Sequence, residues 1–126
     1  MDPHPKRINQ AEKYEFFDRK TNRVVTARAD ALLDKTPVES KYVAPDSKEK
    51  TVYDTSQTRA ERAQGGDEGH IMVLSTEVQA GETPDVRPST RLAEKSDVYF
   101  YDPQRDAITF KWKDGKWEPF TGPIRQ

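Results

Sequence analysis

The sequence of 126 residues has no cysteine, few apolar residues and almost none of the motifs that mark enzymes. Without cysteine there is no disulfide framework and no thiolate to act as a metal ligand or nucleophile. No apolar run exceeds five residues, and the N-terminal stretch MDPHPKRINQ lacks an apolar signal region. We therefore expect neither a transmembrane helix nor a signal peptide, and a location in the cytoplasm or in a particle assembled there.

Catalytic motifs are also scarce. The sequence contains no phosphate-binding glycine loop, no G-x-S-x-G elbow and no H-E-x-x-H, and its two histidines are His4 and His70. We interpret His70, which follows Asp67 and Glu68, as a histidine at the start of a strand, hydrogen-bonded to the backbone. The prediction is a non-enzymatic protein without cofactor or metal. A catalytic pair of carboxylates has no local signature, so the sequence leaves that alternative open.

The composition limits how much of the chain can fold alone. Hydrophobic residues make up 33% of the sequence and charged residues 34%, with a net charge of −1. Ordering one residue costs about 1–2 kcal/mol of backbone entropy, so a chain with little apolar area is expected to keep extended segments. We predict a β-rich α+β protein, in which a small antiparallel sheet with two hairpins carries one to three short helices, an extended N-terminal arm and an irregular linker.

The strongest local pattern lies in residues 97–120, DVYFYDPQRDAITFKWKDGKWEPF, which hold seven of the twelve aromatic residues. Asp114-Gly115 predicts a type I′ turn, because both central positions of that turn need positive φ. A two-residue turn there pairs Lys113 with Lys116, Trp112 with Trp117, Lys111 with Glu118 and Phe110 with Pro119. Since proline cannot donate a backbone hydrogen bond, the last strand is predicted to be an edge strand.

The remaining chain divides into three segments before this β-rich core of residues 67–126. They are an extended arm (1–12), a hairpin over 14–28 followed by a short helix over 28–35, and an irregular linker (36–66) that contains a helix over 58–64. Asn22 is expected to take a left-handed conformation in the first hairpin turn. Within the core, His70–Leu74 is the one continuous apolar run, and residues 70–75 are predicted to form a strand buried on both faces. Ser89–Lys95 predicts a helical turn.

A hydrophobic core is expected from the inward positions of these elements. The predicted core residues are Phe16, Val24, Leu32, Ile71, Val73, Val98, Phe100, Ile108, Phe110, Trp112 and Trp117.

Two groups of side chains are candidates for binding a partner. Tyr42, Val43, Val52 and Tyr53 are spaced along residues 36–56 and cannot bury one another locally, so we expect them to be anchors. Lys111, Trp112 and Trp117 interleave cations with aromatic rings, a pattern that can bind single-stranded nucleic acid. The same alternation is typical of an amphipathic strand with its aromatic face in a core.

The pattern from Val98 through Trp117, two aromatic strands followed by Asp114-Gly115 and a tryptophan, resembles hairpins of phage tail-fibre and other virion proteins. This resemblance covers about one fifth of the chain and implies a structural component of a virus-like particle. We therefore expect a protein–protein interaction or assembly protein, a minor component of a phage-like particle, with one or many copies of a protein partner and no membrane. The alternatives are a small regulator or inhibitor that binds one partner protein, and a module that binds single-stranded nucleic acid.

Overall fold

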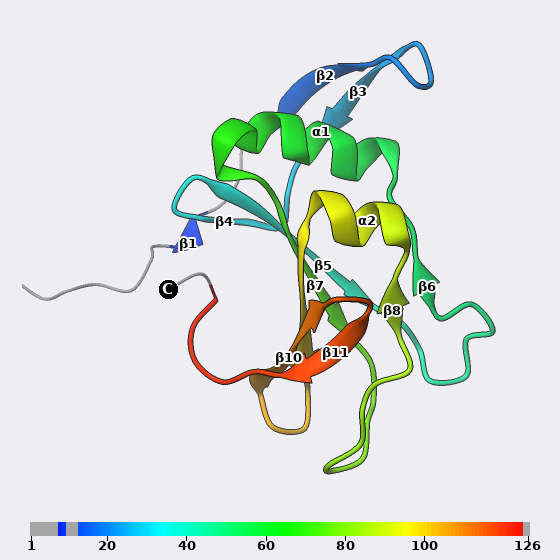
Figure 1. Cartoon of the computed structure of the whole chain (residues 1–126). Helices are drawn as coiled ribbons and strands as arrows, with labels where there is room; N and C mark the ends of the chain where they lie inside the picture. Colours follow the sequence, from blue (N-terminus) through cyan, green and yellow to red (C-terminus); the bar gives the residue numbers. More distant parts are fainter. Residues whose placement is uncertain (1–7, 10–12, 125–126) are drawn as a thin grey trace, which may run out of the picture. The chain divides into compact units, whose positions relative to one another are not determined.

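The computed structural model describes residues 8–9 and 13–124 and is drawn in Figure 1. The described residues form a strand-rich chain with two α-helices. The predicted arm at residues 1–12 lies outside the described residues except for the short strand β1. The strands are β1 (Ile8–Asn9), β2 (Tyr14–Asp18), β3 (Arg23–Ala27), β4 (Ala31–Leu33), β5 (Thr36–Tyr42), β6 (Thr51–Val52), β7 (Ile71–Ser75), β8 (Arg87–Pro88), β9 (Asp97–Asp102), β10 (Ala107–Lys113) and β11 (Lys116–Pro119). The helices are α1 (Ser56–Gly65), a 3₁₀ turn η1 (Gly66–Glu68) and α2 (Thr90–Lys95).

The strands pair as an open seven-stranded sheet in the order β1-β4-β5-β7-β9-β10-β11, with two-stranded pairs β2-β3 and β6-β8. The prediction of a β-rich protein with short helices is confirmed, but a small sheet is wrong. The β6-β8 pair is parallel, so the pairing is also not purely antiparallel. Neither α-helix of the described chain has the length and apolar character that crossing a bilayer requires.

The chain forms two compact units, which we describe separately. The first unit contains the described residues up to Glu39 together with Asp54–Ile71. The second contains Ser40–Tyr53 and the described residues from Met72 onward. Strands β5 and β7 each contribute residues to both units.

In the first unit, helix α1 packs against the hairpin β2-β3. This hairpin is confirmed, and Asn22 has a φ of 59° and donates its backbone N–H to the carbonyl of Asp18. The N-cap of α1 is Thr55, whose hydroxyl accepts the N–H of Thr58, while the hydroxyl of Thr58 accepts the N–H of Thr55. Two backbone donors at the helix start are thereby satisfied without a glutamate at the third position.

The helix predicted over residues 28–35 is wrong. Ala31–Leu33 is the strand β4, which pairs with β5 through a tight turn, and Asp34 in that turn has a φ of 55°. A one- or two-turn helix is intrinsically weak, because nucleating it costs more than its few hydrogen bonds return. Pairing with β5 therefore outweighs the local helical preference.

The irregular linker predicted over residues 36–66 is also wrong in its first part. Residues 36–42 form β5, Thr51 and Val52 form β6, and the N–H of Val43 donates to the carbonyl of Ser75 at 2.9 Å. The helix predicted over 58–64 is confirmed, and α1 begins two residues earlier and ends at Gly65. Backbone pairing with distant strands orders the segment, which has no periodic pattern of its own.

The second unit is built around β9, β10 and β11. The predicted register of the C-terminal hairpin is confirmed at all four pairs, with φ values of 53° at Asp114 and 79° at Gly115. Strand β11 is the last in the sheet order, as predicted. The strand over 70–75 and the helical turn over 89–95 are confirmed as β7 and α2.

Aromatic rings pack around Phe100, which makes edge contacts with Phe110 at 6.2 Å and Trp117 at 5.9 Å between ring centroids. The second unit's core consists of the buried residues Val43, Met72, Leu74, Val86, Leu92, Val98, Phe100 and Trp117. Of the predicted core residues, Ile71, Val98, Phe100 and Trp117 are buried, and Phe16, Leu32, Val73, Ile108, Phe110 and Trp112 are partly buried.

Val24 is a wrong core prediction, since its side chain is 64% exposed. It pairs across the hairpin with Phe17, which is 52% exposed, whereas the neighbouring pair Phe16 and Val25 is partly buried. Successive side chains of a strand alternate between its faces, so the chain buries one of these pairs and leaves the other in solvent.

A candidate interaction groove

An open groove of about 680 Å³ lies in the second unit, where four segments meet. These segments are β6 with the residue after it, β8, α2, and the turn between β10 and β11, which Figure 1 labels. The lining consists of Thr51, Tyr53, Arg87, Pro88, Ser89, Thr90, Ala93, Glu94, Trp112, Lys113, Asp114 and Gly115. Its volume is in the range of about 300–1,000 Å³ that is typical of binding pockets.

The β6-β8 pairing positions Tyr53. The N–H of Arg87 donates to the carbonyl of Lys50 at 2.9 Å, and the N–H of Ser89 donates to the carbonyl of Val52 at 2.8 Å. Val52 packs against the core, while Thr51 and Tyr53 on either side of it line the groove. Alternation along the extended chain accounts for this arrangement. As a result, Tyr53 is held at the groove with 56% of its surface exposed.

Trp112 is positioned by its cross-strand partner. Its ring meets that of Trp117 edge-on, with 5.0 Å between centroids and 83° between planes. Trp117 is buried, and its indole Nε1–H donates to the carbonyl of Val86 at 2.7 Å. Trp117 is thus anchored in the core and supports the half-buried Trp112, which lines the groove.

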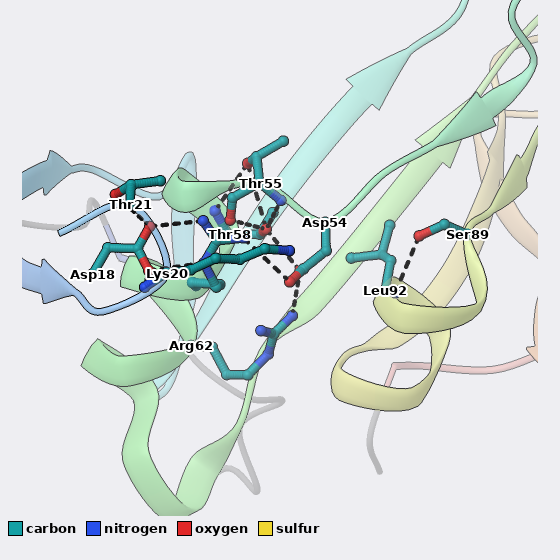
Figure 2. A network of polar contacts seen from close by, with 10 residues as sticks. Asp18, Lys20, Thr21, Asp54, Thr55, Thr58, Arg62, Ser89 and Leu92 are labelled. Carbon is teal, nitrogen blue, oxygen red and sulfur yellow. Dashed lines mark hydrogen bonds and ion pairs between the residues drawn. The ribbon is translucent and has the colours of Figure 1, made fainter. Parts of the chain in front are cut away.

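Helix α2 forms a further part of the groove wall. Its N-cap Ser89 accepts the N–H of Leu92 at 3.2 Å (Figure 2), and the side chain of Leu92 is fully buried in the core. Burial of Leu92 fixes the rotation of this short helix. Thr90, Ala93 and Glu94 consequently line the groove.

The charges of the lining are balanced. Arg87 and Lys113 contribute two positive charges, and Glu94 and Asp114 contribute two negative ones. Among the residues that the structure describes, the lining includes three hydroxyl side chains besides that of Tyr53 and no histidine.

The predicted interaction residues fall into three places in the second unit. Tyr53 and Trp112 line the groove, and Tyr42 is 53% exposed away from its lining. Lys111 lies over the ring of Tyr99, with its Nζ 5.5 Å from the centroid, which is within reach of a cation–π contact. Val43, Val52 and Trp117 belong to the core or pack against it, so they are not surface anchors.

Sequence reasoning missed the residues of β8 and α2 in the lining. Residues 81–88 contain Gly81, Pro84 and Pro88, which oppose regular strand structure, so their sequence predicts a loop. The only local signal was Ser89, a favoured N-cap residue before a short helical segment. Nothing in that signal places Arg87 or Glu94 beside Tyr53.

A network of charged side chains lies in the first unit and is separate from the groove lining. Arg59 pairs with Asp18, and Arg62 donates to Asp54 at 2.8 Å (Figure 2 shows the labelled members). Burial opposes ionisation of Asp54, but the hydrogen bonds from Arg62 and Thr58 and the charge of Arg59 outweigh it and lower the pKa of Asp54. These carboxylates are saturated by their partners, which indicates a structural role.

Comparison of the chain with models of protein families, with curated proteins and with solved structures finds no match.

Proposed function

We propose that this chain is a non-enzymatic interaction module that binds one partner protein through the groove lined by Tyr53 and Trp112. The observation that carries the proposal is that two aromatic side chains line the same groove, and that each has a neighbour packed in the core. Tyrosine and tryptophan are enriched at the centres of protein interfaces because they contribute large contact area at low entropic cost.

The docking of residues 40–53 favours a single-partner binding protein over an assembly protein. A chain that becomes ordered only on assembly would leave these residues undocked until it met its partners. Instead, Val43 is buried and Val52 packs against the second unit's own core. The binding surface is therefore preformed, which lowers the entropic cost of association. Membership of a phage-like particle stays a prediction, because it rests on the resemblance of residues 97–120.

The groove's charges favour a protein segment over nucleic acid as the occupant. A polyanion binds where positive charge accumulates, and the lining carries two charges of each sign. Lys111, the cation predicted to meet phosphates, lies over the ring of Tyr99 and is not part of the lining. Flat aromatic faces beside mixed charges suit an extended peptide segment with apolar and polar side chains.

Two tyrosines of nearly equal exposure allow a matched test. Tyr53 lines the groove and is 56% exposed, whereas Tyr42 is 53% exposed and does not line it. Tagged wild-type protein, Tyr53→Ala and Tyr42→Ala are to be purified from cells of the native source and the bound species quantified by mass spectrometry. We expect one protein to co-purify with wild type and Tyr42→Ala, and to fall about tenfold with Tyr53→Ala, as loss of an interface anchor costs at least about 1.4 kcal/mol.

Equal recovery of the same protein with all three chains would contradict the proposal. Recovery in a large particle containing many copies of the chain would favour the assembly function instead. The nucleic-acid alternative has its own readout, which is an NMR titration of the free protein with a single-stranded oligonucleotide. Shifts at Lys111, Trp112 and Trp117 in that titration would favour it over the protein-binding function.

A further inference from the structure

A buried cluster of acidic and imidazole side chains lies in the first unit, where α1 faces β5 and the start of β7. Glu61 projects from α1, and its Oε1 lies 2.8 Å from Nε2 of His70, just before β7. Both of these side chains are fully buried, with 0% of their surface exposed. Glu39 on β5 completes the cluster. Burying a glutamate away from solvent costs folding free energy unless each carboxylate oxygen has a hydrogen-bond donor.

One oxygen of each glutamate has no such donor. Oε2 of Glu61 and Oε1 of Glu39 are both buried, and neither has a hydrogen-bond partner among the donors of the described residues. The two carboxyls lie within hydrogen-bond reach of each other. A single proton shared between them supplies the missing donor, whereas two ionised carboxylates at this separation would repel each other.

The surroundings of Glu39 favour its protonated form. Burial is the largest cause, and the negative charges of Glu61 and Asp30 add to it, so that the pKa of Glu39 rises to about 8. The backbone N–H of Asp30 donates to Glu39 and opposes this rise only in part. The groups that face Glu39 are thus Asp30 between β3 and β4, and Glu61 on α1, which is itself bonded to His70.

The helix and the strand have no room to separate the two carboxyls while they stay packed. A methyl group at Gly65, the last residue of α1, would lie 2.8 Å from Cδ of Pro37 on β5. Contact this close leaves no layer of water between the end of the helix and the strand. Charge repulsion at Glu39 and Glu61 therefore has to be relieved by movement of α1 or β5, or it remains as a cost to folding.

We propose that Glu39 and Glu61 control the packing of α1 on β5, and we call this pair of residues the latch. When the two carboxyls share a proton, α1 stays packed on β5. When both carboxyls are ionised, α1 is released. His70 fixes the position of Glu61 and is a positioning residue in this device. Across the described residues, no set of three histidine, aspartate or glutamate side chains is arranged to hold a metal ion.

Release of α1 has a consequence within the first unit. Arg59 on the same helix bonds Asp18 at the end of β2, and Arg62 bonds Asp54. Movement of α1 therefore loosens the turn of the β2-β3 hairpin as well. The latch is closed below the pKa of Glu39 and opens as the pH rises through it, so we expect the change between about pH 7 and pH 9.

Two measurements test the latch on the full-length protein. Carbon-13 NMR of the glutamate carboxyls is expected to show Glu39 titrating near pH 8, well above the ordinary glutamate value of 4.5. Hydrogen-exchange protection factors of α1, corrected for the intrinsic rates, are expected to fall at least tenfold from pH 7 to pH 9, while those of α2 stay constant. Glu39→Gln keeps a donor for Glu61 but cannot ionise, so its α1 protection is expected to be independent of pH.

The control variant Glu15→Gln removes an exposed glutamate of the same unit and is expected to behave as wild type. Titration of Glu39 near the ordinary glutamate value of 4.5 would overturn the proposal. So would titration near pH 8 without loss of α1 protection, or a loss that persists in Glu39→Gln. If Glu39→Gln does not fold, the wild-type titration and exchange profile decide the question by themselves.

Discussion

The guanidinium of Arg59 donates two hydrogen bonds to the carboxylate of Asp18, 41 positions earlier in the chain. Nε lies 3.1 Å from Oδ1 and Nη2 lies 2.7 Å from Oδ2. The same carboxylate accepts the backbone N–H of Lys20 and the hydroxyl of Thr21, and so closes the turn of the β2-β3 hairpin. A bidentate pair of this kind joins a local turn to the helix that covers it.

Protonation of Asp18 in acid is expected to break the Asp18–Arg59 pair and so destabilise the protein. The hydrogen bond from Arg59 is the largest cause of a pKa near 2 at Asp18, against an ordinary value of 3.8. Because the folded pKa is the lower one, the stabilisation is complete above pH 3.8 and is lost as the pH falls toward 2. Asp18→Asn should melt below wild type at pH 7, and the difference should shrink between pH 4 and pH 2.

Circular dichroism melting curves at a series of pH values measure this effect. Asp46→Asn, at an exposed position, is the control and should match wild type. Identical melting temperatures for both variants at pH 7 would mean that the Asp18–Arg59 pair contributes nothing to stability.

The turn between β10 and β11 should not tolerate a β-branched residue at Gly115. Its φ is 79°, and a Cβ atom there would meet nothing within 4 Å, so backbone strain alone opposes substitution. Gly115→Val is expected to lower the free energy of unfolding by about 1–3 kcal/mol in urea titrations. Asp114→Gly, which keeps positive φ accessible, should change it by less than about 0.5 kcal/mol. A Gly115→Val chain as stable as wild type would contradict the turn.

Removing the indole N–H of Trp117 should be costly. Trp117→Phe leaves the carbonyl of Val86 without its donor in a buried position, which costs about 1–3 kcal/mol in addition to lost packing. Trp112→Phe leaves that hydrogen bond intact and is expected to cost less. Urea unfolding followed by circular dichroism compares the two variants, and a larger loss for Trp112→Phe would argue against Trp117 as the anchor.

Gly65→Ala tests the contact between α1 and β5. Alanine would normally stabilise a helical position by about 1 kcal/mol relative to glycine. Here its methyl group would lie 2.8 Å from the rigid ring of Pro37, and overpacking of this kind costs about 1–3 kcal/mol. We expect a lower melting temperature for Gly65→Ala and an unchanged one for Gln57→Ala on the exposed face of α1. A more stable Gly65→Ala chain would show that the helix end is not packed on β5.

Features that depend on neighbouring residues could be predicted from the sequence. The register around Asp114-Gly115, the left-handed Asn22 and the end of α1 at Gly65 each follow from a few adjacent residues. Glycine, asparagine and aspartate tolerate positive φ, and that preference is a property of the residue itself. Burial of Trp117 followed as well, because an amphipathic hairpin can bury only one of its faces.

Tertiary structure decided which weak segments became strands and which faces became buried. Residues 31–33 pair with β5 rather than forming a helix. Val43 is held by a hydrogen bond from its N–H to the carbonyl of Ser75, which lies 32 positions later in the chain. Val24 is exposed although its residue type favours burial. None of these outcomes has a local signature, because the partners that determine them are distant in the sequence.

The candidate groove and the buried cluster depend on tertiary structure for the same reason. Two of the predicted interaction residues, Tyr53 and Trp112, do line the groove, but it also requires β8 and α2. The pairing of Glu61 with His70 brings a helix face to the start of a strand. The sequence determined the local turns and caps through short-range backbone preferences, and tertiary structure determined both sites, because only long-range pairing brings their side chains together.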